Sequence, residues 1–194
     1  MTAVAGDDGL RRCGWAYGAP EYIEYHDGEW GRAVRGDDAV FERMVLEAFQ
    51  SGLSWITILR KRAAFRAAFA GFSMDAVARF TDADVARLMA DASIVRNRAK
   101  IDAAIANARA GLELPEGLSQ LVWSFAPTGR RKAPVTLADV PAVSTESTAM
   151  AKELKRRGLR FIGPTTAYAH MQATGMVNDH LVTCARHRAC AKLR

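Results

Sequence analysis

The sequence of 194 residues has few cysteines, no long apolar run and no internal repeat. Three cysteines, an odd number, argue against a scaffold held by disulfides and favour reduced thiols or metal ligands in a cytoplasmic protein. No stretch approaches the roughly 18 apolar residues of a membrane span, which argues against a membrane protein. Residues 1–11 lack the apolar core of a signal peptide, and we expect them to form a disordered lead-in.

The composition is typical of a globular protein, with 49% hydrophobic and 25% charged residues. The length suits one domain, or two small lobes that share a cleft. Because 27 Lys and Arg residues outweigh 21 Asp and Glu residues, the net charge is +6. A basic protein favours an anionic partner, with nucleic acid the first candidate, although many small basic proteins bind nothing anionic.

The hydrophobic pattern predicts a mostly α-helical protein, because the alternation typical of strands persists nowhere in the chain. Capping residues and glycines indicate where the helices begin and end, as in the capping box predicted for residues 81–84. The expected helices lie at about residues 37–51, 54–70, 81–90, 96–112, 118–125, 144–157 and 165–174. Residues 126–134 form a basic loop with two prolines, which we expect to be flexible and solvated.

The stretch 47–61, EAFQSGLSWITILRK, is predicted to end one helix, turn, and begin the next. Gly52 suits the left-handed position that closes a helix, and Ser54 is a good N-cap for the helix that follows. Glu47 lies at the border of an apolar stripe, and Trp55 opens the second helix. A carboxylate and an indole would then flank one corner, although from this stretch alone a solvated Glu and a packed Trp are the more common outcome.

Residues 13–30 are crowded with large rings. Few loops carry so many aromatic side chains without packing them or using them to bind a ligand. The rings belong to Trp15, Tyr17, Tyr22, Tyr25 and Trp30.

A second group of residues has the chemistry of a metal site. His180 and Cys184 are spaced at i and i+4, which would place both on one face of a helix. This spacing matches half of a structural zinc site, in which Zn²⁺ takes imidazole and thiolate ligands tetrahedrally. Cys13 and His26 would complete a site that joins the two ends of the chain. From spacing alone, two buried thiols and two ordinary histidines are an equally good interpretation.

Residues 158–166 are predicted to form a hairpin with a glycine near each end, followed at once by a helix start. Exposed backbone N–H groups and the helix dipole would together make an anion site suited to a DNA phosphate. Taken alone this is weak evidence, because any tight turn between two helices has a similar sequence.

Several stretches together resemble one family, the 3-methyladenine DNA glycosylase I family of bacterial repair enzymes. They are RCGWAYGAPEYIEYHDGEWG, LEAFQSGLSWITILRKR, IVRNRAKIDAAIANARA, VWSF and KRRGLRFIGPTTAYAHMQATGMVNDH. They extend from about Arg12 to Cys184, nearly the whole chain, and their combination is highly specific. The resemblance implies an all-α fold of the helix-hairpin-helix glycosylase superfamily, with a zinc site that joins the N- and C-terminal segments.

The resemblance also implies roles for individual residues. One structural zinc ion would be held by Cys13, His26, His180 and Cys184. Glu47 would be the catalytic residue that binds the damaged base, in a pocket lined by Tyr25, Trp55, Tyr22, Trp15 and Trp30. DNA would be contacted by Gln50, Gly52 and Leu53 in the turn and by Gly158, Gly163 and Thr165 in and after the hairpin.

The implied activity is base-excision repair by a monofunctional glycosylase. It would flip 3-methyladenine out of double-stranded DNA and hydrolyse the N-glycosidic bond. We expect a single glycosylase domain over residues 12–186, with two helical lobes around a cleft, and a frayed tail at residues 187–194. We further expect a monomer that works in the bacterial cytoplasm, at the nucleoid.

Two alternatives remain open at this point. A bifunctional glycosylase/lyase needs a Lys amine to form a Schiff base with the sugar, and Lys100 is the obvious candidate. A non-enzymatic, zinc-stabilised DNA-binding module leaves Glu47 unexplained, because a carboxylate in a groove repels phosphates.

Overall fold

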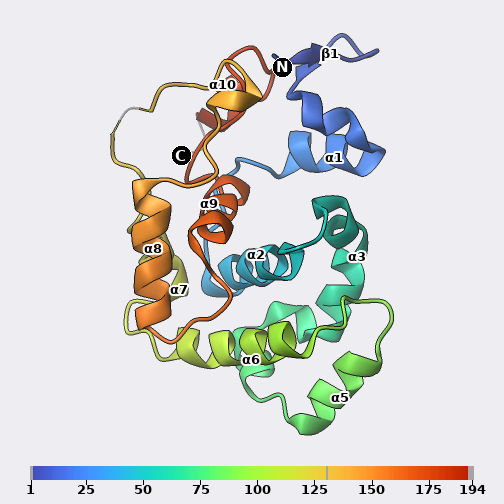
Figure 1. The fold of residues 1–194 in the computed structure, drawn as a ribbon, viewed down its shortest axis with the longest axis vertical. Helices are drawn as coiled ribbons and strands as arrows, with labels where there is room; N and C mark the ends of the chain where they lie inside the picture. The colour runs from blue at the N-terminus through green and yellow to red at the C-terminus, as the bar shows by residue number, and fades with distance from the viewer. Residues whose placement is uncertain (1, 130, 192–194) are drawn as a thin grey trace.

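The computed structural model describes residues 2–129 and 131–191 and shows a mostly helical protein, as the sequence predicts (Figure 1). Two short strands open the chain, β1 (Val4–Ala5) and β2 (Arg11–Arg12). The helices, with 3-10 helices written η, are η1 (Gly14–Gly18), α1 (Pro20–Gly28), α2 (Asp37–Gln50), α3 (Trp55–Ala68), η2 (Ala70–Phe72), α4 (Met74–Ala78), α5 (Asp82–Ala90), α6 (Arg98–Leu112), α7 (Leu118–Trp123), η3 (Leu137–Asp139), α8 (Thr145–Arg156), α9 (Pro164–Ala173) and α10 (His187–Ala191). Within the described residues, no helix has both the length and the apolar character needed to cross a membrane.

The seven helices expected between residues 37 and 174 correspond to α2, α3, α5, α6, α7, α8 and α9, with boundaries that agree to within two residues. The capping box at residues 81–84 forms as predicted. Neither of the first two aspartates of α2 caps its own helix. Instead, the carboxylate of Asp37 accepts the backbone N–H of Ser119, and that of Asp38 accepts the backbone N–H of Met74, both at 2.8 Å. These bonds tie the beginning of α2 to two other segments.

Helix α2 is the centre of the larger hydrophobic core, where it packs against α3, α6, α7 and α9 (Figure 1). Every residue from Met44 to Phe49 is buried. A helix that is buried all round has no solvated border, so this packing carries Glu47 into the interior. The sequence pattern alone favoured a solvated position for that side chain.

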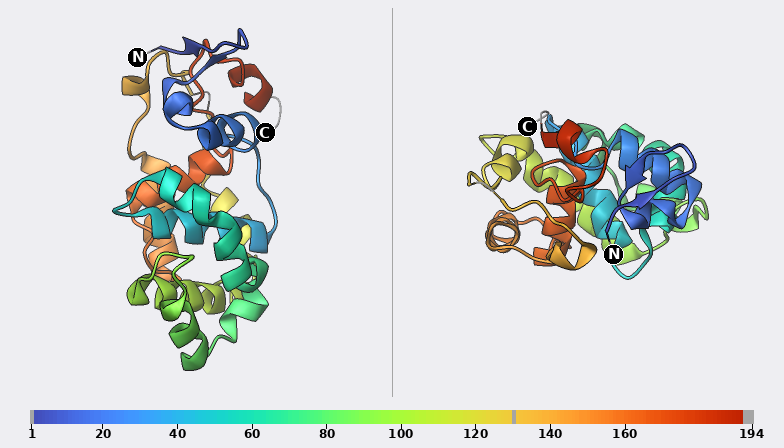
Figure 2. Two further views of the ribbon diagram at one scale, coloured as in Figure 1. Left: turned by 90° about the vertical axis from the view of Figure 1, so that its right-hand side faces the viewer. Right: turned by 90° about the horizontal axis from the view of Figure 1, so that it is seen from above.

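A second, smaller hydrophobic cluster lies where the two ends of the chain meet. It contains the buried side chains of Ala3, Cys13, Leu181 and Cys184, with Trp15, Trp30 and Leu137 packed against them. Figures 1 and 2 show the N- and C-terminal segments side by side at one end of the molecule. Residues 29–36 lead from this end to α2.

Both chain ends contain short secondary-structure elements. In the predicted lead-in, β1 pairs antiparallel with β2, with Val4 opposite Arg12. The buried guanidinium of Arg12 forms ion pairs with Asp8 at 2.6 Å and Asp27 at 2.8 Å. In the predicted frayed tail, residues 187–191 form α10, which buries Cys190. Residues 1 and 192–194 lie outside the described residues.

Candidate active site

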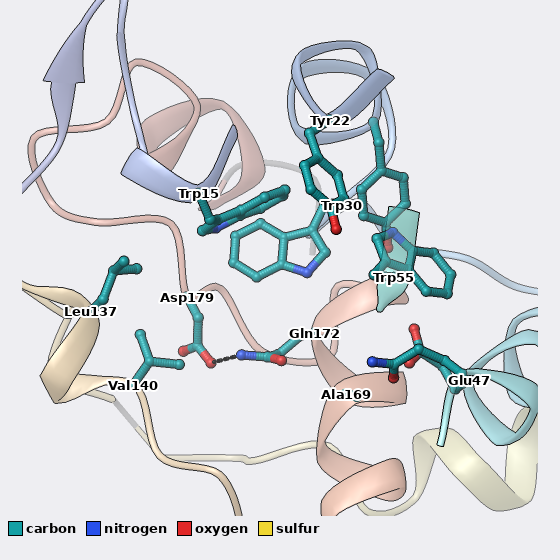
Figure 3. A pocket seen from close by; sticks show the side chains of 12 residues that line it. Trp15, Tyr22, Trp30, Glu47, Trp55, Leu137, Val140, Ala169, Gln172 and Asp179 are labelled. Atoms are coloured by element: carbon teal, nitrogen blue, oxygen red, sulfur yellow. Dashed lines mark hydrogen bonds between the residues drawn. The ribbon is translucent and has the colours of Figure 1, made fainter. Parts of the chain in front are cut away.

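A cavity of about 400 Å³ lies between the two hydrophobic clusters, and side chains packed against both of them line it (Figure 3). The lining residues are Trp15, Tyr22, Tyr25, Trp30, Glu47, Gln50, Trp55, Leu137, Val140, Ala169, Gln172 and Asp179. Glu47 and the five aromatic residues that the resemblance assigned to a pocket all line this one cavity.

Aromatic rings form one wall of the cavity (Figure 3). Trp15 and Trp30 meet edge to face with ring centroids 5.1 Å apart, and Tyr22 packs on Trp15 at 5.8 Å. Further along the wall, the rings of Tyr25 and Trp55 lie 5.3 Å apart. The quadrupoles of such rings attract a cation, so this wall favours a flat, positively charged ligand over a neutral one.

The beginning of α3 connects this wall to the rest of the protein. The hydroxyl of Tyr22 accepts the backbone N–H of Ile56 at 2.9 Å and so caps the first turn of α3. The indole N–H of Trp55 is buried and has no hydrogen-bond partner among the described residues. An unsatisfied buried donor is uncommon in folded proteins.

Glu47 lies in the last turn of α2 and is only 6% exposed. Within the described part of the chain, no hydrogen bond or ion pair engages its carboxyl group. Burial raises the pKa of this group to about 8, and the positive charge of Arg43 acts in the opposite direction. A cationic ligand with N–H donors would supply the interactions that the protein itself does not.

Asp179 is a second buried carboxylate in the cavity wall, and it is fully engaged. It accepts hydrogen bonds from the hydroxyl of Tyr168 at 2.7 Å and from the amide of Gln172 at 2.9 Å. Arg131, in the basic loop, adds an ion pair at 3.4 Å and also donates to the Tyr168 hydroxyl at 2.7 Å. The loop that we expected to be flexible and solvated is thus anchored beside the cavity.

Next to the cavity, four side chains from the two chain ends come together as a possible metal site. The ligand atoms of Cys13, His26, His180 and Cys184 all lie within 4.8 Å of one another, and all four residues are buried. His26 Nε2 and His180 Nδ1 are 3.1 Å apart, and Cys184 Sγ lies 3.5 Å from the first and 3.6 Å from the second. Tetrahedral Zn²⁺ with bonds of about 2.0–2.3 Å has ligand separations of this size.

The outer atoms of the cluster also have suitable partners. His26 Nδ1 lies 2.7 Å from the carboxylate of Asp27, and His180 Nε2 lies 3.1 Å from the carbonyl oxygen of Trp30. Such acceptors fix the tautomer that directs the other ring nitrogen at a metal. The backbone N–H of Leu181 points at Cys13 Sγ, at 3.4 Å, which favours a thiolate. The donor set therefore fits a structural zinc ion.

The sequence correctly predicted that these four residues meet, but the predicted helix over 180–184 is absent. The segment is a turn, because its backbone N–H groups bond to other parts of the chain. Val182 donates to the carbonyl oxygen of Pro134, and Ala185 donates to that of Arg11, both at 2.8 Å. A turn brings His180 and Cys184 to one centre as effectively as a helical face would.

Comparisons with known proteins agree with this geometry. Residues 15–187 match the sequence profile of the methyladenine glycosylase family. DNA-3-methyladenine glycosylase 1 of Escherichia coli (strain K12) is 45% identical over 179 residues, which cover 90% of this chain and 96% of that protein. The chain belongs to the methyladenine glycosylase family. This finding confirms the family and the enzyme class that the sequence predicts.

Solved structures from the same family match the fold. The crystal structure of a 3-methyladenine DNA glycosylase I has a TM-score of 0.86 and 42% identity, and the match covers 90% of this chain and 98% of that one. A variant of 3-methyladenine DNA glycosylase I in complex with 3-methyladenine has a TM-score of 0.84 and 32% identity, with 90% and 96% covered. This member of the methyladenine glycosylase family therefore has the same helical fold as its solved relatives.

The turn between α2 and α3 is exposed at the edge of the cavity. Gly52 adopts a φ of +82°, the left-handed conformation predicted for it. Gln50 lines the cavity, and its side-chain amide donates to the carbonyl oxygen of Leu53 at 3.2 Å. Leu53 is an exposed hydrophobic residue. Of the three residues predicted to contact DNA here, one is in the cavity wall and two face solvent.

Residues 157–163, the segment predicted to be a hairpin, connect α8 to α9. Gly158 has a φ of +89°, and Gly163 is the N-cap of α9 without a side-chain hydrogen bond. Both glycines and Thr165 are exposed. The buried side chain of Asn107 in α6 holds the hairpin, because it donates to the carbonyl oxygen of Arg160 at 3.0 Å and accepts its N–H at 2.7 Å. The hairpin therefore presents a fixed backbone to solvent.

The amine of Lys100 is not placed to attack a sugar, as the amine of a lyase must be. Its ammonium group donates to the carbonyl oxygens of Phe49, at 2.9 Å, and Ser51, at 2.6 Å. These are carbonyls at the C-terminus of α2, where a positive charge is favourable. Lys100 is also not a lining residue of the cavity. Lys100 thus caps the C-terminus of α2, and this argues against the bifunctional glycosylase/lyase that would use it to form a Schiff base.

Several lining residues of this methyladenine glycosylase were not predicted. Asp179 and Gln172 lie within the KRRGLRFIGPTTAYAHMQATGMVNDH stretch, and a carboxylate beside the proposed zinc ligand His180 was a signal that could have been followed. Leu137, Val140 and Ala169 are ordinary apolar residues, and nothing in their sequence context marks them.

Proposed function

We propose that this protein is a monofunctional DNA glycosylase that flips 3-methyladenine out of alkylated DNA and hydrolyses its N-glycosidic bond. The name of its relative in Escherichia coli and the structure of a relative with 3-methyladenine support this substrate. The observation that carries the proposal is the buried carboxyl group of Glu47, which has no hydrogen-bond or ion-pair partner among residues 2–129 and 131–191 and shares its cavity with the rings of Tyr25 and Trp55.

The chemistry of the lesion explains why such a cavity suffices. Methylation at N3 gives adenine a positive charge, and the base leaves the sugar as a neutral molecule. The leaving group therefore needs little help from an acid. The enzyme must extract the nucleotide from the duplex, at a cost of a few kcal/mol, and hold it while water attacks the sugar.

Selectivity follows from charge. A cation over an aromatic face gains about 0.5–2 kcal/mol per good contact, and a buried carboxylate attracts it more strongly. Normal adenine is neutral and gains neither contribution to the same extent. Discrimination is then the difference between two binding free energies, to which Glu47, Tyr25 and Trp55 contribute most, with Trp15, Tyr22 and Trp30 completing the wall.

Protonation of Glu47 is coupled to binding. With a pKa of about 8, this carboxyl group is largely protonated at neutral pH in the empty cavity. A cationic base favours the ionised form, so its binding is accompanied by the release of a proton. The affinity for the methylated nucleotide should therefore increase as the pH rises towards this pKa. The ionised carboxylate also stabilises positive charge that develops on the deoxyribose.

DNA is proposed to lie across the exposed turn and hairpin. In the turn, Leu53 would fill the space left by the flipped nucleotide, beside Gln50 and Gly52. The backbone of the hairpin and the N-terminus of α9 would hold a phosphate, which is the role expected of a helix-hairpin-helix motif. The residues involved would be Gly158, Gly163 and Thr165. The net charge of +6 adds general affinity, which should fall steeply with salt.

One zinc ion is proposed to be held by Cys13, His26, His180 and Cys184. Four protein ligands leave no coordination position for water, so the ion would stabilise the junction of the chain ends and take no part in hydrolysis. We further infer a single glycosylase domain over residues 12–186, its two lobes facing each other across the cavity. It would act as a monomer in the cytoplasm, on the chromosome.

Chromatography of bases released from methylated DNA tests the activity. We expect the protein to release 3-methyladenine, and we expect Glu47→Gln to reduce the rate by about 100-fold, a typical effect of removing one preorganised electrostatic group. Glu24→Gln, an exposed substitution on α1, serves as the control and should keep full activity. Full excision by Glu47→Gln would contradict the role given to this carboxylate.

Metal analysis and unfolding in a chelator test the zinc site. One zinc ion per chain is expected, and its removal should lower the melting temperature, because metal binding and folding are coupled. Cys184→Ser should lose the metal, whereas Cys190→Ser, which is buried nearby but outside the cluster, should retain it. Loss of activity on chelation with an unchanged fold would contradict the structural role.

A further inference from the structure

One carboxylate joins three elements of the cavity wall. Glu29 directly follows α1, and its Oε2 accepts a hydrogen bond from Arg43 Nη2 of α2 at 2.7 Å. The same carboxylate accepts hydrogen bonds from both terminal nitrogens of Arg62 in α3. Nη1 lies 2.6 Å from Oε2, and Nη2 lies 2.7 Å from Oε1. We call Glu29, Arg43 and Arg62 the clamp.

Each residue of the clamp is one or two helical turns from a residue of the proposed base site. Glu29 lies four positions after Tyr25, and Arg43 lies four positions before Glu47. Arg62 lies seven positions after Trp55. Arg43 and Glu47 share one face of α2, and Trp55 and Arg62 share one face of α3. Glu29 lies just beyond α1, where its backbone N–H donates to the carbonyl oxygen of Tyr25 at 2.9 Å. The clamp therefore fixes Tyr25, Glu47 and Trp55 relative to one another, although none of its members lines the cavity.

The ion pairs of the clamp are sheltered from water. The side chains of Arg43 and Arg62 are 14% and 16% exposed, and that of Glu29 is 30% exposed. Burial alone would raise the pKa of Glu29, but its bonds to Arg62 and Arg43 outweigh this and lower the pKa to about 2. Sheltered, bidentate pairs of this kind hold geometry better than exposed ones.

The two arginines differ in one respect. Arg62 directs both of its terminal nitrogens at Glu29, whereas Arg43 directs only Nη2 at it. Nη1 of Arg43 is buried and has no hydrogen-bond partner among the described residues. The charge of Arg43 lowers the pKa of Glu47, and Arg62 is not among the groups that shift it. Arg43 is thus the arginine whose positive charge reaches the unpaired carboxyl group.

The other ionisable groups around Glu47 do not replace Arg43. Tyr25 on α1 is a buried phenol whose pKa is raised, so it stays neutral. His170 on α9 is also buried, and burial together with Arg43 lowers its pKa to about 3, so it is neutral as well. Lys100 on α6 is bound to carbonyl oxygens at the end of α2.

We propose that the clamp positions the three residues of the base site and that Glu29 holds Arg43 where its charge favours the ionised form of Glu47. Arg43 and Glu29 are then positioning residues that act through Glu47. The functional part of this inference rests on the proposed glycosylase activity. The electrostatic part does not, because the ionisation of Glu47 can be measured without any substrate.

The test is a titration of Glu47 by NMR of the side-chain carboxyl carbons, with the signal assigned by its absence in Glu47→Gln. An opposite charge at close range shifts a carboxyl pKa by about 1–3 units, so Arg43→Met should raise the pKa of Glu47 by at least about one unit. Arg62→Met is the matched control, because it removes bonds to the same carboxylate but should leave the titration of Glu47 unchanged. Arg43→Lys should restore the value of the original protein.

If Arg43→Met does not fold, Arg43→Gln replaces it, because its amide can still donate to Glu29 but carries no charge. An unchanged Glu47 titration in the neutral variant, or an equal shift in Arg62→Met, would overturn the inference. The pH profile of 3-methyladenine release gives the functional readout. If the pKa of Glu47 rises by about one unit in Arg43→Met, the acid limb of the profile should move up by about one pH unit. At pH values below the limb, the activity of the variant should then be about tenfold lower. Absence of release by the unmodified protein would refute the proposed function and leave the NMR result valid.

Discussion

Glu47 and Asp179 are both buried carboxyl groups in the wall of one cavity, yet their surroundings are opposite in kind (Figure 3). Asp179 has a phenol, an amide and a guanidinium as partners. Glu47 has no partner among the described residues. A protein can bury a carboxyl group by supplying donors to the charged form, or by tolerating the neutral form. The donors at Asp179 make that end of the cavity structural, whereas the end at Glu47 is open to a ligand.

The difference originates in the elements that surround each group. Tyr168 and Gln172 extend from α9, and Arg131 comes from the basic loop, so three side chains converge on Asp179. The rings beside Glu47 belong to Tyr25 and Trp55 and offer apolar surface. The comparison can be sharpened by three measurements of stability.

The largest change in the free energy of unfolding is expected for Glu47→Gln, and the change should depend on pH. The folded-state pKa of about 8 lies above the ordinary value of 4.5, so the folded state prefers the protonated group. This preference contributes fully below about pH 4.5 and is lost as the pH rises through 8. The free energy of unfolding of Glu47→Gln should therefore exceed that of the original protein increasingly with pH, by up to roughly 4 kcal/mol at pH 9.

Denaturant titrations at pH 5, 7 and 9 measure this difference. Glu24→Gln, exposed on α1, should show no comparable trend. If the free energies of unfolding of Glu47→Gln and the original protein differed by the same amount at all three pH values, folding would not raise the pKa of Glu47, and the contrast with Asp179 would fail.

A loss of stability is expected for Asp179→Asn. The variant leaves Arg131 without its ion pair and gives Tyr168 and Gln172 a weaker acceptor. Breaking a buried charged network by removing one partner typically costs about 3 kcal/mol. Chemical denaturation at pH 7 measures the change. If Asp179→Asn were as stable as the original protein, its partners would not be what keeps this carboxylate buried.

The smallest effect is expected for Arg131→Gln. The Arg131 side chain is 30% exposed, and a partly exposed ion pair contributes about 1 kcal/mol or less. A double-mutant cycle with Asp179→Asn isolates this pair, and a coupling free energy of about 0.5–1 kcal/mol is expected. Zero coupling would show that Tyr168 and Gln172 alone satisfy the carboxylate.

Helix boundaries and the members of the Cys/His cluster could be predicted because their signals are local or chemically specific. Capping residues and glycines lie next to the boundaries they mark, as at the turn around Gly52. Cys13, His26, His180 and Cys184 are residue types with few other uses in combination, and the family resemblance selected them from the remaining candidates.

Features that depend on contacts between distant segments could not be predicted. The burial of Glu47 follows from the packing of α2 on all sides, which no single helix reveals. The pairing of Glu29 with Arg62 joins residues 33 positions apart, and neither residue stands out in its own stretch. The turn at 180–184 replaces the expected helix because two distant carbonyl groups take its N–H donors.

The ring of His180 packs against Trp30 with centroids 4.7 Å apart and against His26 at 4.6 Å, so the aromatic wall is supported at Trp30 by a residue 150 positions later in the chain. During synthesis the N-terminal segment therefore leaves the ribosome long before the surface that completes it exists. Until residues 180–184 have been translated, Trp30 lacks its contact with the ring of His180. The wall of the cavity is consequently complete only after nearly the whole chain has been made, however early its central helix forms.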